Sequence, residues 1–387
     1  MNERMHFVTR LEAGDRMTDL CREYGISRKT GYKFWERYRK LGPKGLFDES
    51  KKPFRHPQQI SEEAKKLVLD LKREKPTWGP RKIFEQLSRR HPGVRIPSRP
   101  TIYLLLDRNG LVKKRGHRRT LKASGTRITL ALAPNELWCA DFKGEFRLGN
   151  REYCYPLTIT DHFSRYLLGV EALENTKALP AHGVFESVFR QYGLPKAILS
   201  DNGSPFGSVG LFGWSRLSLW LMRLGIEIQR IEPGHPEQNG RHERMHLTLK
   251  QETTRPSGQT ILQQQEKFDK FRDDFNTDRP HEGLGMKYPA QIYSASPRPF
   301  PEELSIPEYP LHDLTKTVLA GGFIQIGRFR GKVERFHLGQ AFIGQRVGLR
   351  EEESGLWRVS FLKYDLGFYD SDKKRFQPFE CPVLTDG

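Results

Sequence analysis

Three segments of the chain carry carboxylates in settings where an acidic side chain can do chemistry. Asp141 follows the apolar residues Trp138-Cys-Ala, where a charged group is costly to bury unless a cation or hydrogen-bond partner offsets it. Asp201 follows the apolar run 197–200 and precedes an Asn-Gly turn, so we expect it at the rim of a sheet, where α/β proteins bind ligands. The third segment, residues 233–246, contains two acids, Glu237 and Glu243.

Three carboxylates that converge while leaving coordination positions open are typical ligands of Mg²⁺ or Mn²⁺. Two such ions can hold the attacking and leaving oxygens of an in-line phosphoryl displacement. The acidic segments therefore predict metal-dependent chemistry on a phosphate ester.

The elements that position these acids read as a mixed α/β arrangement. Short β-rich runs joined by brief connections predict three antiparallel strands, after which helices and strands alternate before two final helices. This order is typical of a mixed sheet covered on both faces. We expect strands at 137–142, 153–160, 166–170, 197–200 and 226–231, and helices at 178–192, 210–224, 241–254 and 260–277.

The first 50 residues predict a helix-turn-helix. A helical stretch stops at Gly25, and Ser27 can cap a second helix with its hydroxyl. In that second helix Gly31, Phe34, Trp35 and Tyr38 share one inward face. The basic residues left toward solvent indicate a helix that enters a DNA groove, with a plain helical hairpin as the alternative. They are Arg28, Lys29, Lys33, Arg37 and Lys40.

A second three-helix unit follows a basic, Pro-rich link, with helices expected after Ser61, after Trp78 and after Ser98. Beyond it, residues 113–134 hold seven basic side chains and no acid. This segment is either a linker that becomes ordered along a phosphate backbone or a plain tether. Its candidate DNA contacts are Lys113, Lys114, Arg115, Arg118 and Arg119.

The charge distribution separates the first 134 residues from the rest of the chain. The 387 residues carry a net charge of +18, yet residues 1–134 alone contain 33 Lys and Arg against 14 Asp and Glu, a net charge of +19. A basic block before a neutral block predicts a module that binds a polyanion, attached to a domain with another task. With 36% hydrophobic residues, no long apolar run and four scattered cysteines, we expect neither a membrane protein nor a secreted one.

The acidic motifs, taken in order, resemble the catalytic core of retroviral integrases and bacterial insertion-sequence transposases. The chain contains Trp-x-x-Asp, then Ser-Asp-Asn-Gly-Ser-x-Phe, then His-Pro-x-x-x-Gly-x-x-Glu-Arg-x-His, and 276–285 also matches. The resemblance covers 135–295 and implies a ribonuclease-H-like fold with a mixed five-stranded sheet and an Asp-Asp-Glu triad. It further implies two Mg²⁺ or Mn²⁺ ions per site, held by Asp141, Asp201 and Glu243. The zinc-binding domain of retroviral integrases is not visible in the sequence.

The choice of glutamate requires a departure from the usual spacing. Many members of the family have 35 residues between the second Asp and the Glu, a spacing that Glu237 satisfies, whereas Glu243 leaves 41. We select Glu243 because the family motif ends in Gly-x-x-Glu at a helix start, as Gly240-Arg-His-Glu243 does. Six additional residues fit in the Gly-rich segment 207–218, which we expect to be a flexible insertion.

Other polar residues of the core receive more modest predictions. On the helix of Glu243, the side chains of His246 and Lys250 share its face, and both are predicted to contact DNA. Asp161 and His162 are expected at a strand turn, and His235 either steadies the catalytic loop or is an ordinary loop residue. Arg279 and His281 either contact DNA or seal the last helix against the core.

These features predict a multidomain protein, and the resemblance implies a DNA transposase. We expect helix-turn-helix units at 1–55 and 56–112, a basic linker at 113–134, the core at 135–296, a linker at 297–315 and a small β-barrel at 316–387. The enzyme would bind terminal inverted repeats, cleave the ends and join the 3′-hydroxyls to target DNA. It would act as a multimer on double-stranded DNA, in the bacterial cytoplasm with the nucleoid. The alternatives are a DNA-binding regulator with an inactive core and a structure-specific nuclease.

Overall fold

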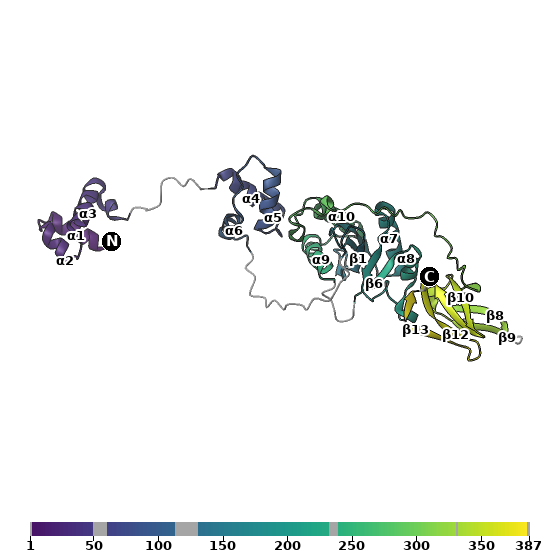
Figure 1. Cartoon of the computed structure of the whole chain (residues 1–387). Helices are drawn as coiled ribbons and strands as arrows, with labels where there is room; N and C mark the ends of the chain where they lie inside the picture. The colour runs from purple at the N-terminus through teal and green to yellow at the C-terminus, as the bar shows by residue number, and fades with distance from the viewer. Residues whose placement is uncertain (1, 49–59, 113–130, 232–238, 330–331, 385–387) are drawn as a thin grey trace. The chain divides into compact units, whose positions relative to one another are not determined.

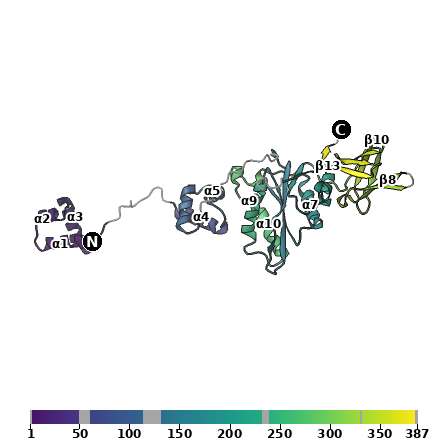
Figure 2. The same ribbon diagram turned by 90° about the horizontal axis from the view of Figure 1, so that it is seen from below.

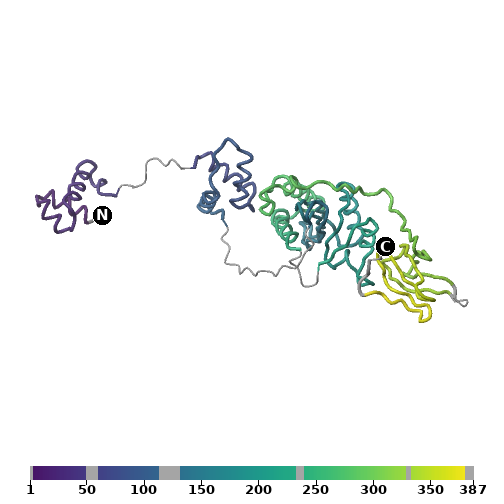
Figure 3. Tube along the Cα trace, viewed as in Figure 1, coloured from purple at the N-terminus to yellow at the C-terminus, as the bar shows by residue number. Residues whose placement is uncertain are grey.

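The computed structural model of the chain describes residues 2–48, 60–112, 131–231, 239–329 and 332–384. Two compact units are present, Met1–Ser61 and Glu62–Gly387, and Figure 3 traces the backbone through them. Among the described residues no helix is both long enough and apolar enough to cross a membrane.

The first unit is a small helical domain whose local structure follows the sequence pattern. Gly25 has a φ of 64°, and Thr30 N donates to the Ser27 hydroxyl at 3.2 Å, so the expected stop and cap are both present. Phe7, Leu20 and Leu46 are buried in its core, and Phe34, Trp35 and Tyr38 pack against them. The elements are α1 (Asn2–Glu12), α2 (Met17–Glu23), α3 (Arg28–Leu41) and the short η1 (Gly42–Leu46).

The second unit begins with the expected three further helices. Trp78, Ile83 and Ile102 lie in one buried cluster, which brings the three amphipathic faces together. Ion pairs join this bundle to the end of α10: Lys75 Nζ lies 2.9 Å from Asp274 Oδ2, and an Arg90 guanidinium nitrogen lies 2.9 Å from Asp278 Oδ1. The helices are α4 (Glu62–Glu74), α5 (Pro80–Arg90) and α6 (Arg99–Arg108).

The central sheet is mixed, as expected. Its strand order is β4-β3-β1-β5-β6, with the short β2 also paired to β3. β3 is antiparallel to β1 and β4, whereas β5 is parallel to β1 and to β6. The strands are β1 (Leu137–Phe142), β2 (Phe146–Arg147), β3 (Tyr153–Asp161), β4 (Leu167–Leu173), β5 (Ala197–Ser200) and β6 (Glu227–Arg230).

Helices cover both faces of this sheet. Figure 2 shows the sheet nearly edge-on, with α9 and α10 on one side and α7 on the other. On one face Trp138 and Ala140 of β1 pack in a cluster with α7 and α8, and on the opposite face residues of β3 and β4 pack with α9 and α10. The helices are α7 (Ala178–Tyr192), α8 (Arg216–Arg223), α9 (Gly240–Thr253) and α10 (Ile261–Thr277).

The C-terminal part is all-β, but a closed barrel is not confirmed. Five strands form an open antiparallel sheet in the order β13-β12-β11-β10-β7, and β8 and β9 form a separate hairpin (Figure 1). Side chains of both sheets share one hydrophobic cluster with Trp214, Leu219 and Met222 of the core. The strands are β7 (Leu314–Thr317), β8 (Phe323–Phe329), β9 (Lys332–His337), β10 (Arg346–Glu353), β11 (Leu356–Phe361), β12 (Tyr364–Asp370) and β13 (Arg375–Leu384).

The segment 207–218 is held in place by contacts, in contrast to the flexible insertion that we expected. Ser208 N donates to Gly213 O at 2.8 Å, and an Arg230 guanidinium nitrogen donates to the same oxygen at 2.6 Å. The Trp214 ring lies 6.1 Å from that of Phe342 and 5.7 Å from that of Tyr364, measured between centroids. Its glycines permit the turn, and its aromatic residues dock the C-terminal strands on the core.

Candidate active site

Asp141 and Asp201 lie at the same edge of the sheet because their strands run parallel. β1 and β5 pair with Cys139 opposite Leu199, so two further residues along each strand bring both acids to the carboxyl end. Asp141 is half-buried and Asp201 is exposed. Asp201 Oδ1 accepts the Gly203 amide at 3.1 Å, which anchors its carboxylate in the turn after β5.

The electrostatics of Asp141 reflect the acids around it. Burial raises the pKa of Asp141 to about 7, and the charges of Asp201 and Glu243 add to that increase. One donor partly offsets this cost, since Asn239 Nδ2 donates to Asp141 Oδ2 at 3.1 Å. Mutual repulsion among carboxylates at a sheet edge is the condition that a bound dication relieves.

Glu243 belongs to the first turn of α9 and is exposed. An acid is favoured at that position because the N-terminal end of a helix carries partial positive charge. Its charge acts on Asp141 across the space between helix and strand. Glu237 and His235 lie outside the described residues.

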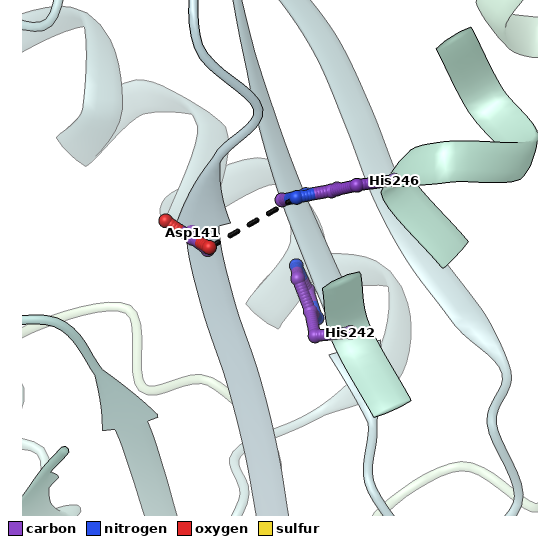
Figure 4. A group of neighbouring side chains, drawn as sticks. All are labelled: Asp141, His242 and His246. Carbon is purple, nitrogen blue, oxygen red and sulfur yellow. Dashed lines mark ion pairs between the residues drawn. The ribbon is translucent and has the colours of Figure 1, made fainter. Parts of the chain in front are cut away.

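Two histidines of α9 support Asp141 from within the core (Figure 4). Thr158 Oγ1 lies 2.7 Å from Nε2 of His242 and 2.7 Å from Nε2 of His246. The Thr158 hydroxyl donates its single hydrogen to the main-chain oxygen of Asp141 at 3.1 Å, so both rings donate to that hydroxyl through Nε2–H. Thr160 Oγ1 lies 2.8 Å from His242 Nδ1 and completes the network.

The two rings are neutral at neutral pH. Burial lowers the pKa of His242 to about 3. Burial, with smaller effects of His242 and Lys143, lowers the pKa of His246 to about 2. His246 Nδ1 carries a lone pair in this arrangement and lies 3.9 Å from Asp141 Oδ2.

Asp141, His242 and His246 offer ligand atoms that lie within 4.8 Å of one another. Both nitrogens of His242 are already engaged with threonine hydroxyls, which leaves that ring no free donor atom. The carboxylates instead match the oxygen preference of Mg²⁺ and Mn²⁺. We therefore assign His242 to the support of Asp141 through Thr158, whereas His246 binds Thr158 through Nε2 and turns its Nδ1 toward Asp141 Oδ2.

The position of His246 corrects the prediction that it contacts DNA. Its side chain is only 6% exposed, and its Nε2 is bound to Thr158. The helical periodicity placed His246 correctly on the face of Glu243, but this part of that face packs on β3. Lys250, one turn further along, is exposed.

The basic residues of α3 fall into two groups. Arg28, Lys29 and Lys33 are exposed, as a DNA-binding surface requires. Arg37 is half-buried, and its guanidinium donates to the Phe47 main-chain oxygen at 2.5 Å, so part of its hydrogen-bonding capacity is used within the domain. Lys113, Lys114, Arg115, Arg118 and Arg119 lie outside the described residues.

Asp161, Arg279 and His281 have structural roles in the core. Asp161 accepts from Asn135 N and from Ser164 N and hydroxyl, which fixes the turn after β3. Arg279 is 8% exposed and lies 2.7 Å from Glu252 of α9, while the His281 ring packs on Phe275. Of the two alternatives for Arg279 and His281, these contacts support sealing of the last helix against the core.

Sequence reasoning missed two residues beside Asp141. Asn239 precedes α9 and binds the carboxylate directly, and the sequence around it reads only as a polar turn. Lys143 lies two residues beyond Asp141, and the two-residue period of a strand could have revealed that both side chains share one face.

Comparisons with known proteins agree with this geometry. Residues 131–236 and 224–289 match family models described as "Integrase core domain". Residues 3–54 match a "Helix-turn-helix domain" and residues 30–106 a "Homeodomain-like domain". The two integrase matches together span all three predicted catalytic acids.

Similar curated proteins come from insertion elements and retroviruses. An uncharacterized 31.7 kDa protein of insertion element IS407 from Burkholderia multivorans is 25% identical over 58% of this chain and 78% of its own length. An uncharacterized 39.2 kDa protein of IS476 from Xanthomonas euvesicatoria is 26% identical over 63% of this chain and 69% of its own. A Gag-Pol polyprotein of baboon endogenous virus is 31% identical over 37% of this chain and 8% of its own.

The chain therefore contains an integrase core domain, and it is similar to proteins encoded by insertion elements. The integrase core domain is the α/β sheet with its covering helices, and the helix-turn-helix domains precede it. The resemblance inferred from the acidic motifs is thereby confirmed at the level of the family.

Proposed function

We propose that this protein is a transposase that binds the terminal inverted repeats of a mobile element, cleaves the ends and joins them to target DNA. In the first step, water attacks a phosphorus atom and the 3′-oxygen leaves with a proton as a hydroxyl. In the second step, that 3′-hydroxyl attacks a phosphorus of target DNA and displaces a target 3′-oxygen. Each step forms one P–O bond and breaks one, without a covalent enzyme intermediate.

The position of Asp141 and Asp201 at the same edge of the sheet, on the parallel strands β1 and β5, is the observation that carries this proposal. The raised pKa of Asp141 supports a cation site, because burial and the charges of Asp201 and Glu243 make its ionisation unfavourable unless positive charge is present. Asp141, Asp201 and Glu243 would hold two Mg²⁺ or Mn²⁺ ions, which when bound activate water and stabilise the attacking and leaving oxygens. Asn239 and the Thr158–histidine network would keep the Asp141 carboxylate oriented.

The other parts of the chain would deliver DNA to this site. The exposed basic side chains of α3 support end recognition by the first unit. We further propose that the C-terminal strands bind DNA or a second subunit. Because two element ends must be joined, the active form would be a multimer on DNA, located in the cytoplasm with the nucleoid.

The decisive experiment compares Asp201→Asn with the wild type on duplex DNA that contains an element end. We expect Asp201→Asn to lower cleavage by at least about 10²-fold in Mg²⁺ while end binding stays nearly unchanged. Asp273→Asn, on the exposed surface of α10, is the matched control and should cleave normally. Equal cleavage by Asp201→Asn would exclude the proposed enzyme.

The same assay distinguishes the alternatives and the two glutamates. Cleavage without joining of the 3′-end would indicate a nuclease, and binding without cleavage by the wild type would indicate a regulator. Glu243→Gln should be inactive and Glu237→Gln active. The reverse result would transfer the third catalytic position to Glu237.

A further inference from the structure

The three-helix bundle α4–α6 contacts the core through polar side chains, most of them on α5. An Arg90 guanidinium nitrogen donates to both carboxylate oxygens of Asp278, at 2.9 and 3.1 Å. Gln86 Nε2 donates to the same carboxylate, and Lys75 Nζ lies 3.5 Å from it. Because Asp278 is the C-cap of α10, three donors of the bundle converge on one carboxylate at the end of that helix.

The core binds Gln86 of α5 on both sides of its amide. Gln86 is only 2% exposed, and its Oε1 accepts the Tyr288 hydroxyl at 2.7 Å. The Arg89 guanidinium lies over the Tyr288 ring, 4.5 Å from its centroid, and donates to Met286 O at 2.7 Å. A buried amide that loses its partners is costly, so Gln86 favours this one arrangement of bundle and core.

This interface depends on charge and hydrogen bonds. In the described ranges, the buried apolar cluster of the bundle contains no residue of the core, whereas the C-terminal strands share an apolar cluster with the core. Water is nevertheless partly excluded, since the Lys75 side chain is 15% exposed and its Nζ lies 2.9 Å from Asp274 Oδ2. Complementary polar contacts fix the register of two surfaces more than they add affinity. The interface is therefore suited to holding the bundle in one orientation.

The bundle also contacts α9, the helix that carries Glu243. The Thr77 hydroxyl donates to Glu252 Oε1, and the same oxygen lies 2.7 Å from an Arg279 guanidinium nitrogen. Glu252 and Glu243 are separated by about 14 Å along α9, at 1.5 Å per residue. The orientation of the bundle is thereby tied to the helix of the third acid.

The last helix of the bundle, α6, stays free while α5 is docked. Among the residues that the structure describes, no hydrogen bond or ion pair joins α6 to the core, and its Arg99 pairs with Glu85 within the bundle. Tyr103, Leu104 and Arg108 of α6 are exposed. In a helix-turn-helix pair the second helix enters the major groove. Docking through α5 is therefore compatible with DNA binding by α6.

We propose that this interface is a positioning contact, which holds α6 at a fixed place relative to Asp141 and Asp201 and thereby selects the phosphodiester that is cleaved. The inference rests on the proposed function and assigns positioning roles to Gln86, Arg90 and Asp278. They act through the DNA that α6 binds and do not touch the reacting atoms. Successive phosphates of one strand are about 3.4 Å apart along the duplex, so a loosened bundle presents neighbouring bonds to the same acids.

The first arm of the test maps the bond that the full chain cleaves in end-containing duplex, in Mg²⁺ and at single-nucleotide resolution. Arg90→Glu and Asp278→Lys each place like charges in contact and should release the bundle. We expect cleavage at the wild-type position to fall by up to about 10²-fold, with new cuts at neighbouring phosphodiesters. Arg90→Lys retains the ion pair and should cut at the wild-type position. Arg73→Glu, at a side chain of α4 that is 73% exposed, is the matched control for charge on the bundle and should also cut there.

The second arm measures docking without any cleavage. A carbodiimide couples an ammonium to a carboxylate only where the two are in contact, so the wild type should form a cross-link between Lys75 and Asp274 that mass spectrometry identifies. Arg90→Glu and Asp278→Lys should lose it. The cross-link of the wild type should persist when end-containing duplex is bound without divalent ions. Its loss on DNA would overturn the proposal, because the bundle would then leave the core before cleavage.

The two arms together separate this inference from the proposed function. If Arg90→Glu loses the cross-link yet cuts at the wild-type position alone, the positioning contact is excluded and the proposed function is unaffected. A cross-link retained in both variants would show that docking does not depend on Asp278, which also overturns the assignment. Absence of cleavage by the wild type would overturn the proposed function itself.

Discussion

At the scale of single residues, the environment of Asp141 opposes the ionisation of its carboxyl group. Its carboxylate is partly buried and lies near two other acids, which raises its pKa to about 7 from an ordinary value of 3.8. Asn239 donates an amide hydrogen to this carboxylate, and the uncharged His246 ring lies 3.9 Å from it, so neither neighbour supplies positive charge at neutral pH. The ionised form of Asp141 is therefore destabilised in the metal-free protein, and a bound cation would stabilise it.

This cost predicts a pH-dependent stability of the metal-free protein. Between about pH 4 and pH 7 the native state binds a proton at Asp141 that the unfolded state has lost, so the free energy of unfolding falls as the pH rises through this window. Asp141→Asn removes the penalty. We expect it to unfold at higher urea than the wild type at about pH 8, by roughly 1–4 kcal/mol, with little difference at about pH 4.

The control for this measurement is Asp273→Asn, whose side chain is 75% exposed and which should match the wild type at both pH values. Added Mg²⁺ should stabilise the wild type and not Asp141→Asn, because only a ligand that binds the native state raises stability. A wild type that becomes more stable with rising pH across the same window would contradict the assignment.

At the scale of elements, the loop between β5 and α8 connects the catalytic edge to the C-terminal strands. It begins directly after Asp201 and ends in Trp214, whose side chain is only 9% exposed. Trp214 shares a hydrophobic cluster with Leu219 and Met222 of α8 and with residues of β10–β12. The segment 207–218, in which we expect the additional residues between Asp201 and Glu243, thus forms a contact with the C-terminal strands.

We predict that Trp214→Ala loosens this contact. Loss of a large buried aromatic side chain typically costs about 3–5 kcal/mol. Hydrogen exchange should therefore show reduced protection of amides in β10–β12, with the central strands β1 and β3 nearly unaffected. Leu179→Ala, at a side chain that is 83% exposed, is the control. Unchanged protection of β10–β12 would show that the strands are held by other contacts.

At the scale of the whole molecule, charge is segregated by function. The net charge of +19 in residues 1–134 contrasts with a nearly neutral remainder, which contains the catalytic carboxylates. Binding of a polyanion by the first part therefore does not require the second part to be basic. Long-range attraction of this kind depends on salt, since it releases counterions from the phosphates.

We predict that the double variant Lys29→Gln/Lys33→Gln reduces both the affinity for end DNA and its salt dependence. Each lost phosphate contact should lower the slope of log affinity against log salt by about 0.9. Lys177→Gln/Lys270→Gln removes the same charge from exposed positions on the core and should have a smaller effect. Equal slopes for the two double variants would show that α3 does not contact the backbone.

The elements that carry the acids were predictable from sequence because their patterns are local. The observed bounds of β1, α7 and β5 coincide with the expected ones, since apolar period and turn residues act over a few neighbours. The order of the acidic motifs also identified the family. Ser27 and Gly25 delimited the helices of the first unit in the same way, through hydrogen bonds and backbone angles within one turn.

The sequence alone determined which residues could do chemistry and on which elements they lie. Only the tertiary structure decided which of them meet, because contacts between elements depend on how whole faces pack. The periodicity of α9 assigned His246 and Lys250 to one face, but packing on β3 buried the first and left the second exposed. The docking of Trp214 on Phe342 and Tyr364 joins residues distant in sequence, and no local pattern encodes such distances.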